Sequence, residues 1–395
     1  MILAYVKPTN YCNVGCTHCY LPESIRAHKE LMSMKTLEDA AVLLRDMQTR
    51  NGLKKLDEVQ FLWHGGEPLT VPLDWYEESG EILDKYIPNR VESIQTSLVP
   101  LKKEYIPFVI KRLDSQMGSS IDFSQRQIKG SVENFHSLWM KKVDLARENG
   151  ILITPGVVPT SKEVGRERYM VEWFMDRQFR LFNIDRYNSY ANAFDDRPSN
   201  LEHSHFLIGL FDVLMEKMDT HGWAPVIGAI SGAITGVLFQ QGGDRWGGSC
   251  QSDFVVVEPD GGLNTCPDKS TLEDPYSYAH EGFKTFAASK FRRKWIRHQN
   301  LTHKMPHCEV CENQNWCKSG CPITPNGPQM GESECSGYKT FINHVRKFAS
   351  TEYGHAKLLG YLDQMAQNPW IASGITYGGS AMLDSLHRNK EEMGV

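Results

Sequence analysis

The sequence predicts an α/β fold in which a partial barrel of about six strand–helix units precedes a small cysteine-rich domain. Two observations predict this arrangement. Over roughly the first 200 residues, short apolar runs alternate with helix-like patterns, which is typical of a parallel sheet covered by helices. In addition, the ten cysteines form two clusters, Cys12 to Cys19 and Cys250 to Cys335, with none in the 230 residues between them. Six units fit a partial (β/α)6 barrel better than a closed eight-fold barrel.

Each predicted strand is a short apolar run that a glycine, a proline or a polar loop ends. Strands are expected at 2–6, 58–63, 91–97, 116–123, 151–158 and 181–187, and helices at 34–50, 75–87, 105–112, 132–148, 166–177 and 201–220. A further helix is expected at 226–239. Gly228, Gly232 and Gly236 recur there every four residues, so we expect one bare face that packs closely on a neighbour.

The composition is that of an ordinary globular protein, with 41% hydrophobic and 23% charged residues. The formal net charge of -5 gives no general affinity for polyanions, so no nucleic-acid partner is expected. The best candidate for a membrane span, the uncharged 14-residue run 226–239, is too short. The N-terminus has no signal-peptide pattern. We therefore expect a cytoplasmic protein that binds no membrane.

Cys12, Cys16 and Cys19 are spaced C-x3-C-x2-C. Three thiolates this close can hold three irons of a 4Fe-4S cluster and leave the fourth iron open, whereas an electron-transfer ferredoxin normally supplies four cysteines. An open iron indicates chemistry rather than storage of an electron. A zinc site remains the alternative for this motif alone, because zinc also takes three or four Cys or His ligands.

With His18 before the third cysteine and Tyr20 after it, the motif resembles that of the radical S-adenosylmethionine (SAM) enzymes. The resemblance implies that the open iron chelates SAM, whose reductive cleavage yields a 5'-deoxyadenosyl radical that abstracts a hydrogen atom. It also implies that Tyr20 lies at the cofactor.

Gly65, Gly66 and Glu67 follow the second predicted strand and resemble the superfamily motif that holds the SAM amino group. Two glycines let the backbone approach a ligand closely, and a carboxylate can accept from an ammonium group. The same resemblance assigns cofactor contacts to Gln95, Ser120 (ribose), Arg126 (SAM carboxylate) and Val157 (adenine), and it places Asp122 toward the substrate as a catalytic candidate. A surface arginine is the alternative for Arg126.

The second cysteine cluster resembles the SPASM extension of radical SAM enzymes. It reads Cys250-x10-Gly-x4-Cys266, then Cys308-x2-Cys311-x5-Cys317-x3-Cys321, then Cys335. A hairpin is expected at the turn 259–262. By resemblance, Cys308, Cys311, Cys317 and Cys335 ligate an outer auxiliary 4Fe-4S cluster, and Cys250, Cys266 and Cys321 ligate an inner one that lacks one cysteine. The expected cofactors are therefore three 4Fe-4S clusters and SAM. A zinc ribbon contains two Cys-x2-Cys pairs, whereas only one is present here, so this region favours iron–sulfur clusters over zinc.

We expect four regions: the barrel at 1–200, a helical linker at 201–249, the SPASM domain at 250–340, and a C-terminal helix with a loosely structured tail at 341–395. The helix is expected at 341–365. The tail from Asn368 is expected to be loosely structured because it contains Gly374, Gly378 and Gly379.

The predicted function is that of a radical SAM/SPASM oxidoreductase that oxidatively modifies a ribosomally made precursor peptide by a carbon–carbon or thioether crosslink. The alternatives are a sulfatase-maturing (formylglycine-generating) enzyme, a small-molecule dehydrogenase and, in another class, an iron–sulfur electron-transfer protein. Asp268 lies two residues after Cys266, near the position of the acid/base aspartate of sulfatase-maturing relatives, although it also suits a turn cap.

The predicted partners are the precursor peptide and a flavodoxin- or ferredoxin-type reductant. Because the predicted barrel begins at Ile2, with no winged-helix leader-recognition domain before it, recognition of the peptide is expected to use the barrel mouth, the SPASM extension or a separate leader-recognition protein.

Overall fold

The computed structural model describes residues 2–49, 58–186, 196–243, 245–247, 253–268, 274–302, 305–321, 323–324, 333–375 and 379–393. Two compact units make up the chain. The first comprises Met1–Ile153, Ser189–Ala193 and Ser249–His298, and the second comprises Thr154–Asn188, Phe194–Gly248 and Gln299–Val395.

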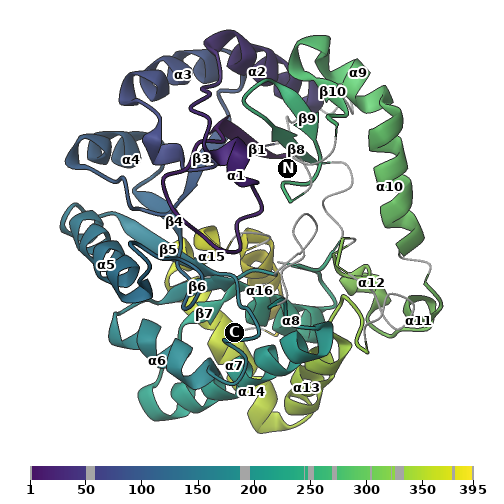
Figure 1. Cartoon of the computed structure of the whole chain (residues 1–395). Helices are drawn as coiled ribbons and strands as arrows, with labels where there is room; N and C mark the ends of the chain where they lie inside the picture. Colours follow the sequence, from purple (N-terminus) through teal and green to yellow (C-terminus); the bar gives the residue numbers. More distant parts are fainter. Residues whose placement is uncertain are drawn as a thin grey trace. The chain divides into compact units, whose positions relative to one another are not determined.

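The first unit is built on a mostly parallel sheet with the strand order β10-β9-β8-β1-β2-β3-β4 (Figure 1). Its strands are β1 (Ile2–Thr9), β2 (Val59–Gly65), β3 (Arg90–Thr96), β4 (Gln116–Ser120), β8 (Phe254–Val257), β9 (Gly262–Asn264) and β10 (Ser277–Tyr278). β1 to β4 pair in parallel, as the sequence predicts. β8 and β9 form the expected antiparallel hairpin. The sequence did not indicate that β8 pairs in parallel with β1.

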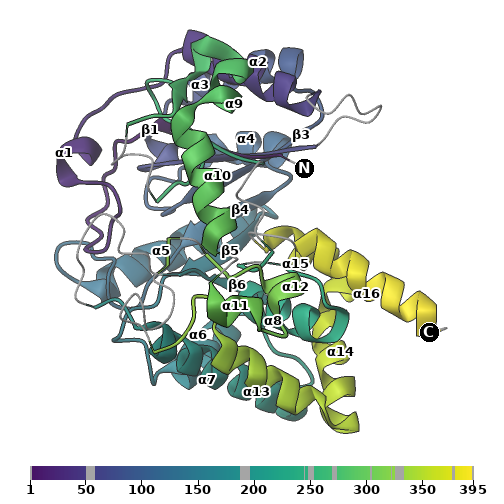
Figure 2. The same ribbon diagram turned by 90° about the vertical axis from the view of Figure 1, so that its right-hand side faces the viewer.

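The helices of the first unit are amphipathic and cover the sheet. They are α1 (Glu23–Arg26), α2 (Met34–Gln48), α3 (Leu73–Tyr86), α4 (Ile106–Arg112), α5 (Val132–Glu148), α9 (Gly282–Ala288) and α10 (Lys290–Thr302), with 3-10 turns at Pro68–Thr70, Lys103–Tyr105 and Ala279–Glu281. Ser33 and Ser131 begin α2 and α5, because each side chain accepts a hydrogen bond from a backbone N–H of the first turn. Figures 1 and 2 show α2 lying beside α3 and α9.

The second unit contains a short parallel sheet and a layer of helices. Its strands are β5 (Leu152–Val157, which leads into the unit), β6 (Leu181–Ile184) and β7 (Val226–Ile227). Its helices are α6 (Glu167–Asp176), α7 (Asn200–His221), α8 (Gly228–Phe239), α11 (Pro306–Glu309), α12 (Gln314–Cys317), α13 (Lys339–Ala349), α14 (Glu352–Gln367), α15 (Pro369–Gly374) and α16 (Gly379–Met393). Gly236 of the glycine-rich helix packs as expected, since a Cβ there would lie 2.4 Å from the Trp316 ring.

Two predictions for the C-terminal region are wrong. The single helix expected at 341–365 is divided into α13 and α14, because Thr351 caps α14 and a Cβ on Gly354 would lie 1.9 Å from the Phe348 carbonyl oxygen. The tail, expected to be loosely structured, forms α15 and α16. Met382, Ser385 and Leu386 of α16 are buried at helical spacing, and the glycines lie at helix ends rather than inside.

Within the described ranges, no helix has both the length and the apolar character that crossing a bilayer requires.

A buried ion pair joins β1 to β8. Val6 pairs with Val257, which places Lys7 beside Glu258 at the carboxyl ends of these two strands. The Lys7 side chain is fully buried, and its Nζ lies 2.6 Å from Glu258 Oε1. Asn10 Nδ2 donates to Glu258 Oε2 at 3.0 Å. The strand that precedes the first cysteine loop is therefore fixed to the strand that precedes Cys266.

We predict that Lys7→Met lowers the free energy of unfolding by about 3–5 kcal/mol, because it leaves a buried carboxylate without its cation. Urea unfolding measures this loss. Lys35→Ala is the control, since Lys35 pairs with Asp39 but is 73% exposed, and a much smaller loss of stability is expected for an exposed pair. The double variant K7M/E258M should recover much of the loss. A K7M cost equal to that of K35A would contradict the prediction.

Candidate functional site

The first cysteine cluster lies in a loop between β1 and α1. Cys12 N–H donates to the Arg26 carbonyl at 3.0 Å, which closes the loop at its far end. Gly66 N–H donates to the Thr9 carbonyl at 3.0 Å, and Glu67 N–H donates to the Tyr11 carbonyl at 2.8 Å. The structure thus brings together the two motifs that the sequence predicts to act on SAM.

The contact between the cysteine loop and the end of β2 requires a glycine at position 66. A Cβ at Gly66 would lie 2.2 Å from the Tyr11 carbonyl oxygen and 2.4 Å from that of Asn10. Gly65 has a φ of +114°, a conformation that side-chain-bearing residues rarely adopt. The two glycines therefore let the end of β2 lie directly against the cysteine loop.

The Glu67 carboxylate is buried and already hydrogen-bonded at both oxygens. Oε1 accepts from Leu69 N–H at 3.0 Å and from the Thr96 hydroxyl at 2.5 Å. Oε2 accepts from Ser97 N–H at 2.8 Å and from the Ser97 hydroxyl. Ser97 thus holds the Glu67 carboxylate in place. An ammonium group would have to replace one of these donors, and the SAM contact of Glu67 stays a prediction.

Buried polar side chains lie around Tyr20, beside the cysteine loop. The Tyr20 hydroxyl donates to the Gly65 carbonyl at 3.2 Å, and Lys7 Nζ lies 5.2 Å from the Tyr20 ring centroid. Burial, and then the negative charges of Glu258, Cys19 and Asp268, raise the pKa of Tyr20 well above its ordinary value, so the phenol keeps its proton.

His64 lies 6.3 Å from Tyr20 between ring centroids. Burial and the Lys7 charge lower the pKa of His64 to about 3, so this imidazole is neutral at pH 7.

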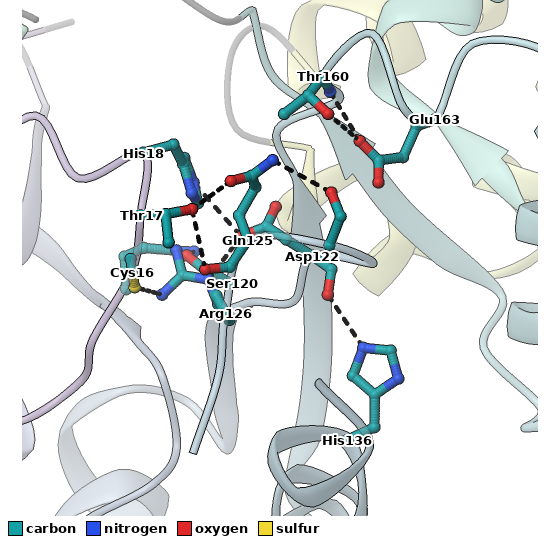
Figure 3. A network of polar contacts seen from close by, with 12 residues as sticks. Cys16, Thr17, His18, Ser120, Asp122, Gln125, Arg126, His136, Thr160 and Glu163 are labelled. Atoms are coloured by element: carbon teal, nitrogen blue, oxygen red, sulfur yellow. Dashed lines mark hydrogen bonds and ion pairs between the residues drawn. The ribbon is translucent and has the colours of Figure 1, made fainter. Parts of the chain in front are cut away.

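The remaining predicted cofactor contacts fall in two places. Gln95 Nε2 donates to the Ser120 hydroxyl at 2.9 Å in the first unit, where β3 and β4 end. Val157 is buried at the end of β5 in the second unit. Asp122 and Arg126, for which the sequence predicts separate roles, are paired with each other at 2.6 Å (Figure 3).

The cysteines of the second cluster are divided between the units. Cys266 and Asp268 follow β9 in the first unit and are half-buried, and Cys250 lies outside the described residues. In the second unit, a Cβ on Gly337 would lie 2.6 Å from Cys317 Sγ and 3.8 Å from Cys335 Sγ, so these two thiols flank one glycine. The second unit also contains Cys308, Cys311 and Cys321 of the second cysteine cluster.

Burial raises the pKa of Cys12, Cys317 and Cys335 to about 12, so these thiols stay protonated unless a metal takes the proton's place. Among the described residues, no three His, Cys, Asp or Glu side chains are grouped as they are around a single metal ion.

Two buried polar atoms beside the cysteine loop fit a further polar ligand. Asn10 Oδ1 and His64 Nδ1 have no hydrogen-bond partner among the described residues. Buried polar atoms of this kind are normally hydrogen-bonded, and a bound polar group or a water molecule can supply the partner. The residues therefore fit a cluster-bound, polar cofactor such as SAM.

Sequence reasoning missed Lys7, Asn10, His64 and Glu258 as parts of this site. The available signal was a lysine that directly follows an apolar strand and a glutamate that directly follows another.

No protein-family model matches this chain. A "Serine-type anaerobic sulfatase-maturating enzyme" of Bacteroides thetaiotaomicron is 26% identical over 87% of this chain and 89% of its own length. A "Cysteine-type anaerobic sulfatase-maturating enzyme" of Clostridium novyi is 23% identical over 85% of this chain and 93% of its own. An uncharacterised protein of Archaeoglobus fulgidus is 30% identical over 119 residues, and that match spans 25% of its length.

Two solved structures share the fold. That of anSMEcpe with bound AdoMet has a TM-score of 0.72 at 17% identity and covers 91% of this chain and 99% of that chain. That of Streptococcus suis SuiB bound to precursor peptide SuiA has a TM-score of 0.56 at 15% identity and covers 84% and 73%. The α/β fold with a parallel sheet, followed by a cysteine-rich region with a hairpin, is therefore confirmed.

We predict that Gly66→Ala abolishes assembly of the first cluster, because its Cβ overlaps two carbonyl oxygens of the cysteine loop. Iron per chain after anaerobic reconstitution measures the loss, which should be about four irons. Gly15→Ala is the matched control, since Gly15 lies in the same loop with nothing within 4 Å of a Cβ. An equal iron content in G66A and G15A would contradict the close contact between Gly66 and the cysteine loop.

Proposed function

We propose that this chain, a radical SAM oxidoreductase with a SPASM region that is related to the anaerobic sulfatase-maturating enzymes, oxidises a serine or cysteine side chain of a polypeptide. One observation carries the proposal. The similarity to both a serine-type and a cysteine-type enzyme of that name extends over 85–87% of this chain and over 89–93% of the relatives' own lengths. This supports the sulfatase-maturing alternative better than the peptide crosslink that the sequence favours.

The cofactors are SAM and three 4Fe-4S clusters. When bound, they supply the 5'-deoxyadenosyl radical that takes a hydrogen atom from the substrate and an acceptor for the electron that leaves it. Cys12, Cys16 and Cys19 hold the SAM-binding cluster. Cys308, Cys311, Cys317 and Cys335 hold the outer auxiliary cluster, and Cys250, Cys266 and Cys321 hold the inner one.

The chain itself has to remove one proton. Oxidation of a CH2–OH or CH2–SH side chain to the (thio)aldehyde removes one hydrogen atom from carbon, then one proton from oxygen or sulfur together with one electron. The thioaldehyde formed from cysteine then reacts with water to give the aldehyde and hydrogen sulfide. We assign Asp268 as the base that accepts the proton from oxygen or sulfur. This carboxylate is half-buried directly after the Cys266 hairpin, and its charge acts on Tyr20, which follows Cys19. Tyr20 keeps its own proton and lines the site without accepting one.

The substrate is proposed to be a peptide segment, and the electron donor a flavodoxin- or ferredoxin-type protein. Relatives support the first assignment. anSMEcpe has been solved with the Kp18Cys peptide, and SuiB with the precursor peptide SuiA. Crosslinking of a precursor peptide is the second candidate, supported by the fold shared with SuiB.

We predict that the reconstituted protein, with SAM and a reductant, converts synthetic peptides that contain one serine or one cysteine to aldehydes. Mass spectrometry and labelling with a hydrazide read out the product, because a hydrazide captures an aldehyde but not a crosslink. A loss of two hydrogens without hydrazide labelling would instead favour crosslinking. Oxidation of small alcohols with no reaction of any peptide would contradict the proposal.

We predict that Asp268→Asn slows peptide oxidation by about 10²–10⁴-fold, the usual contribution of a general base. Formation of 5'-deoxyadenosine should continue, because Asp268 does not hold SAM. Asp260→Asn is the matched control. Asp260 is an exposed carboxylate in the same hairpin that accepts from Gly262 N–H, a bond that asparagine can also accept. Equal rates in D268N and wild type would remove Asp268 from the mechanism.

A further inference from the structure

The segment that follows β4 is hydrogen-bonded to the cysteine loop. Thr17 N–H donates to the Gln125 carbonyl at 3.2 Å, and the Thr17 hydroxyl donates to both the carbonyl and the side chain of Gln125. Thr17 lies between Cys16 and His18, so these bonds hold the middle of the cysteine loop against residues 122–126 (Figure 3). No local sequence pattern indicates this contact, because 108 residues separate its partners.

Asp122 is the centre of this contact. Its carboxylate is almost fully buried, with 2% of the side chain exposed. Oδ2 accepts from Arg126 Nε at 2.6 Å and lies 3.4 Å from His18 Nε2. The ring of His136, on α5, lies within 2.9 Å of the Asp122 backbone carbonyl oxygen. Figure 3 shows Asp122 between His136 on one side and the cysteine loop on the other. A carboxylate held in this way is poorly placed to act on a substrate.

Arg126 extends from this carboxylate to the cysteine loop. While Nε bonds Asp122, Nη1 lies 3.2 Å from Cys16 Sγ, and only 14% of the side chain is exposed. The planar guanidinium can serve both partners at once because its N–H groups point in fixed, divergent directions. The positive charge also lowers the pKa of Cys16 against the larger opposing effect of burial.

We propose that Arg126, oriented by Asp122, donates a hydrogen bond to the Cys16 thiolate of the SAM-binding 4Fe-4S cluster and thereby raises the cluster's reduction potential. The proposal rests on the cofactor assignment above. It gives Arg126 a role toward the cluster itself, in place of the contact with the SAM carboxylate that the sequence predicts. Asp122 is a positioning residue in this arrangement, rather than a substrate-facing acid.

The charge of Arg126 predicts the direction in which the reduction potential shifts. Reduction adds one negative charge to a cluster that already carries three thiolates, so a nearby cation and an N–H···S bond stabilise the reduced form more than the oxidised form. Removing them disfavours reduction. An arginine that bound only the SAM carboxylate would instead leave the potential of the SAM-free cluster unchanged. The two roles therefore predict different results in the absence of SAM.

The test is an EPR redox titration of the reconstituted protein without SAM. The signal of the first cluster is the one that disappears in the C12A/C16A/C19A variant. For Arg126→Gln we expect the equilibrium constant for reduction of the first cluster to fall at least tenfold. This corresponds to a reduction potential lower by about 59 mV for a one-electron couple. Arg126→Lys should shift it in the same direction, because the three N–H donors of an ammonium share one nitrogen and do not span Asp122 Oδ2 and Cys16 Sγ as two nitrogens of the guanidinium do.

Arg45→Gln is the control for the loss of an arginine, since Arg45 is 46% exposed on α2 and pairs with Asp46. The reduction potential of the first cluster in R45Q should equal that in the wild type. An unchanged potential in R126Q, or in R126K, would overturn the hydrogen bond as the tuning contact. Loss of about four irons from both Arg126 variants, but not from R45Q, would also overturn it, because Arg126 would then act in assembly. Absence of the first-cluster signal from the wild type would instead refute the cofactor assignment.

Discussion

The buried pair of Lys7 and Glu258 is the interaction on which the arrangement of the first unit depends. It connects two strands that are 251 residues apart in the sequence, β1 and β8, at the ends from which two cysteine-bearing segments leave. Burial of two charges is favourable only when each is paired and hydrogen-bonded, and Asn10 supplies the additional bond to the carboxylate. The cysteine loop on one side and the Cys266 hairpin on the other therefore keep a fixed spacing, which an enzyme that passes an electron from a substrate to an auxiliary cluster requires.

The same principle of buried, satisfied carboxylates recurs at the other strand ends. Glu67 is held by Thr96 and Ser97, and Asp122 is held by Arg126. Each carboxylate joins a loop to its neighbour and is itself shielded from solvent. The acids nearest the cysteine loop thus maintain its shape, whereas Asp268, in a half-buried turn, is the acid that we assign to chemistry. Position in the hydrogen-bond network, rather than residue type, separates the two roles.

Local sequence signals predicted much of this structure. Apolar alternation placed the parallel strands to within a few residues, and Cys12, Cys16, Cys19 and the Gly65–Glu67 motif indicated the cofactor because their chemistry lies within a few residues of sequence. What the sequence did not predict depends on distant partners. The pairing of β8 with β1, the Thr17–Gln125 contact and the burial of Lys7 against Glu258 each join segments whose contact no local pattern records. The helical C-terminus was missed because its glycines were weighted above the buried spacing of Met382 and Leu386.

The central claim is that the cysteines hold three 4Fe-4S clusters, one of which binds SAM at Cys12, Cys16 and Cys19. The most direct measurement is the iron, sulfide and zinc content per chain after anaerobic reconstitution, combined with Mössbauer spectroscopy. We predict about twelve irons with matching sulfide, falling to about eight in C12A/C16A/C19A. About four irons in the wild type, with zinc in the remaining cysteines, would contradict the account, because no auxiliary cluster would then be present to accept the substrate electron.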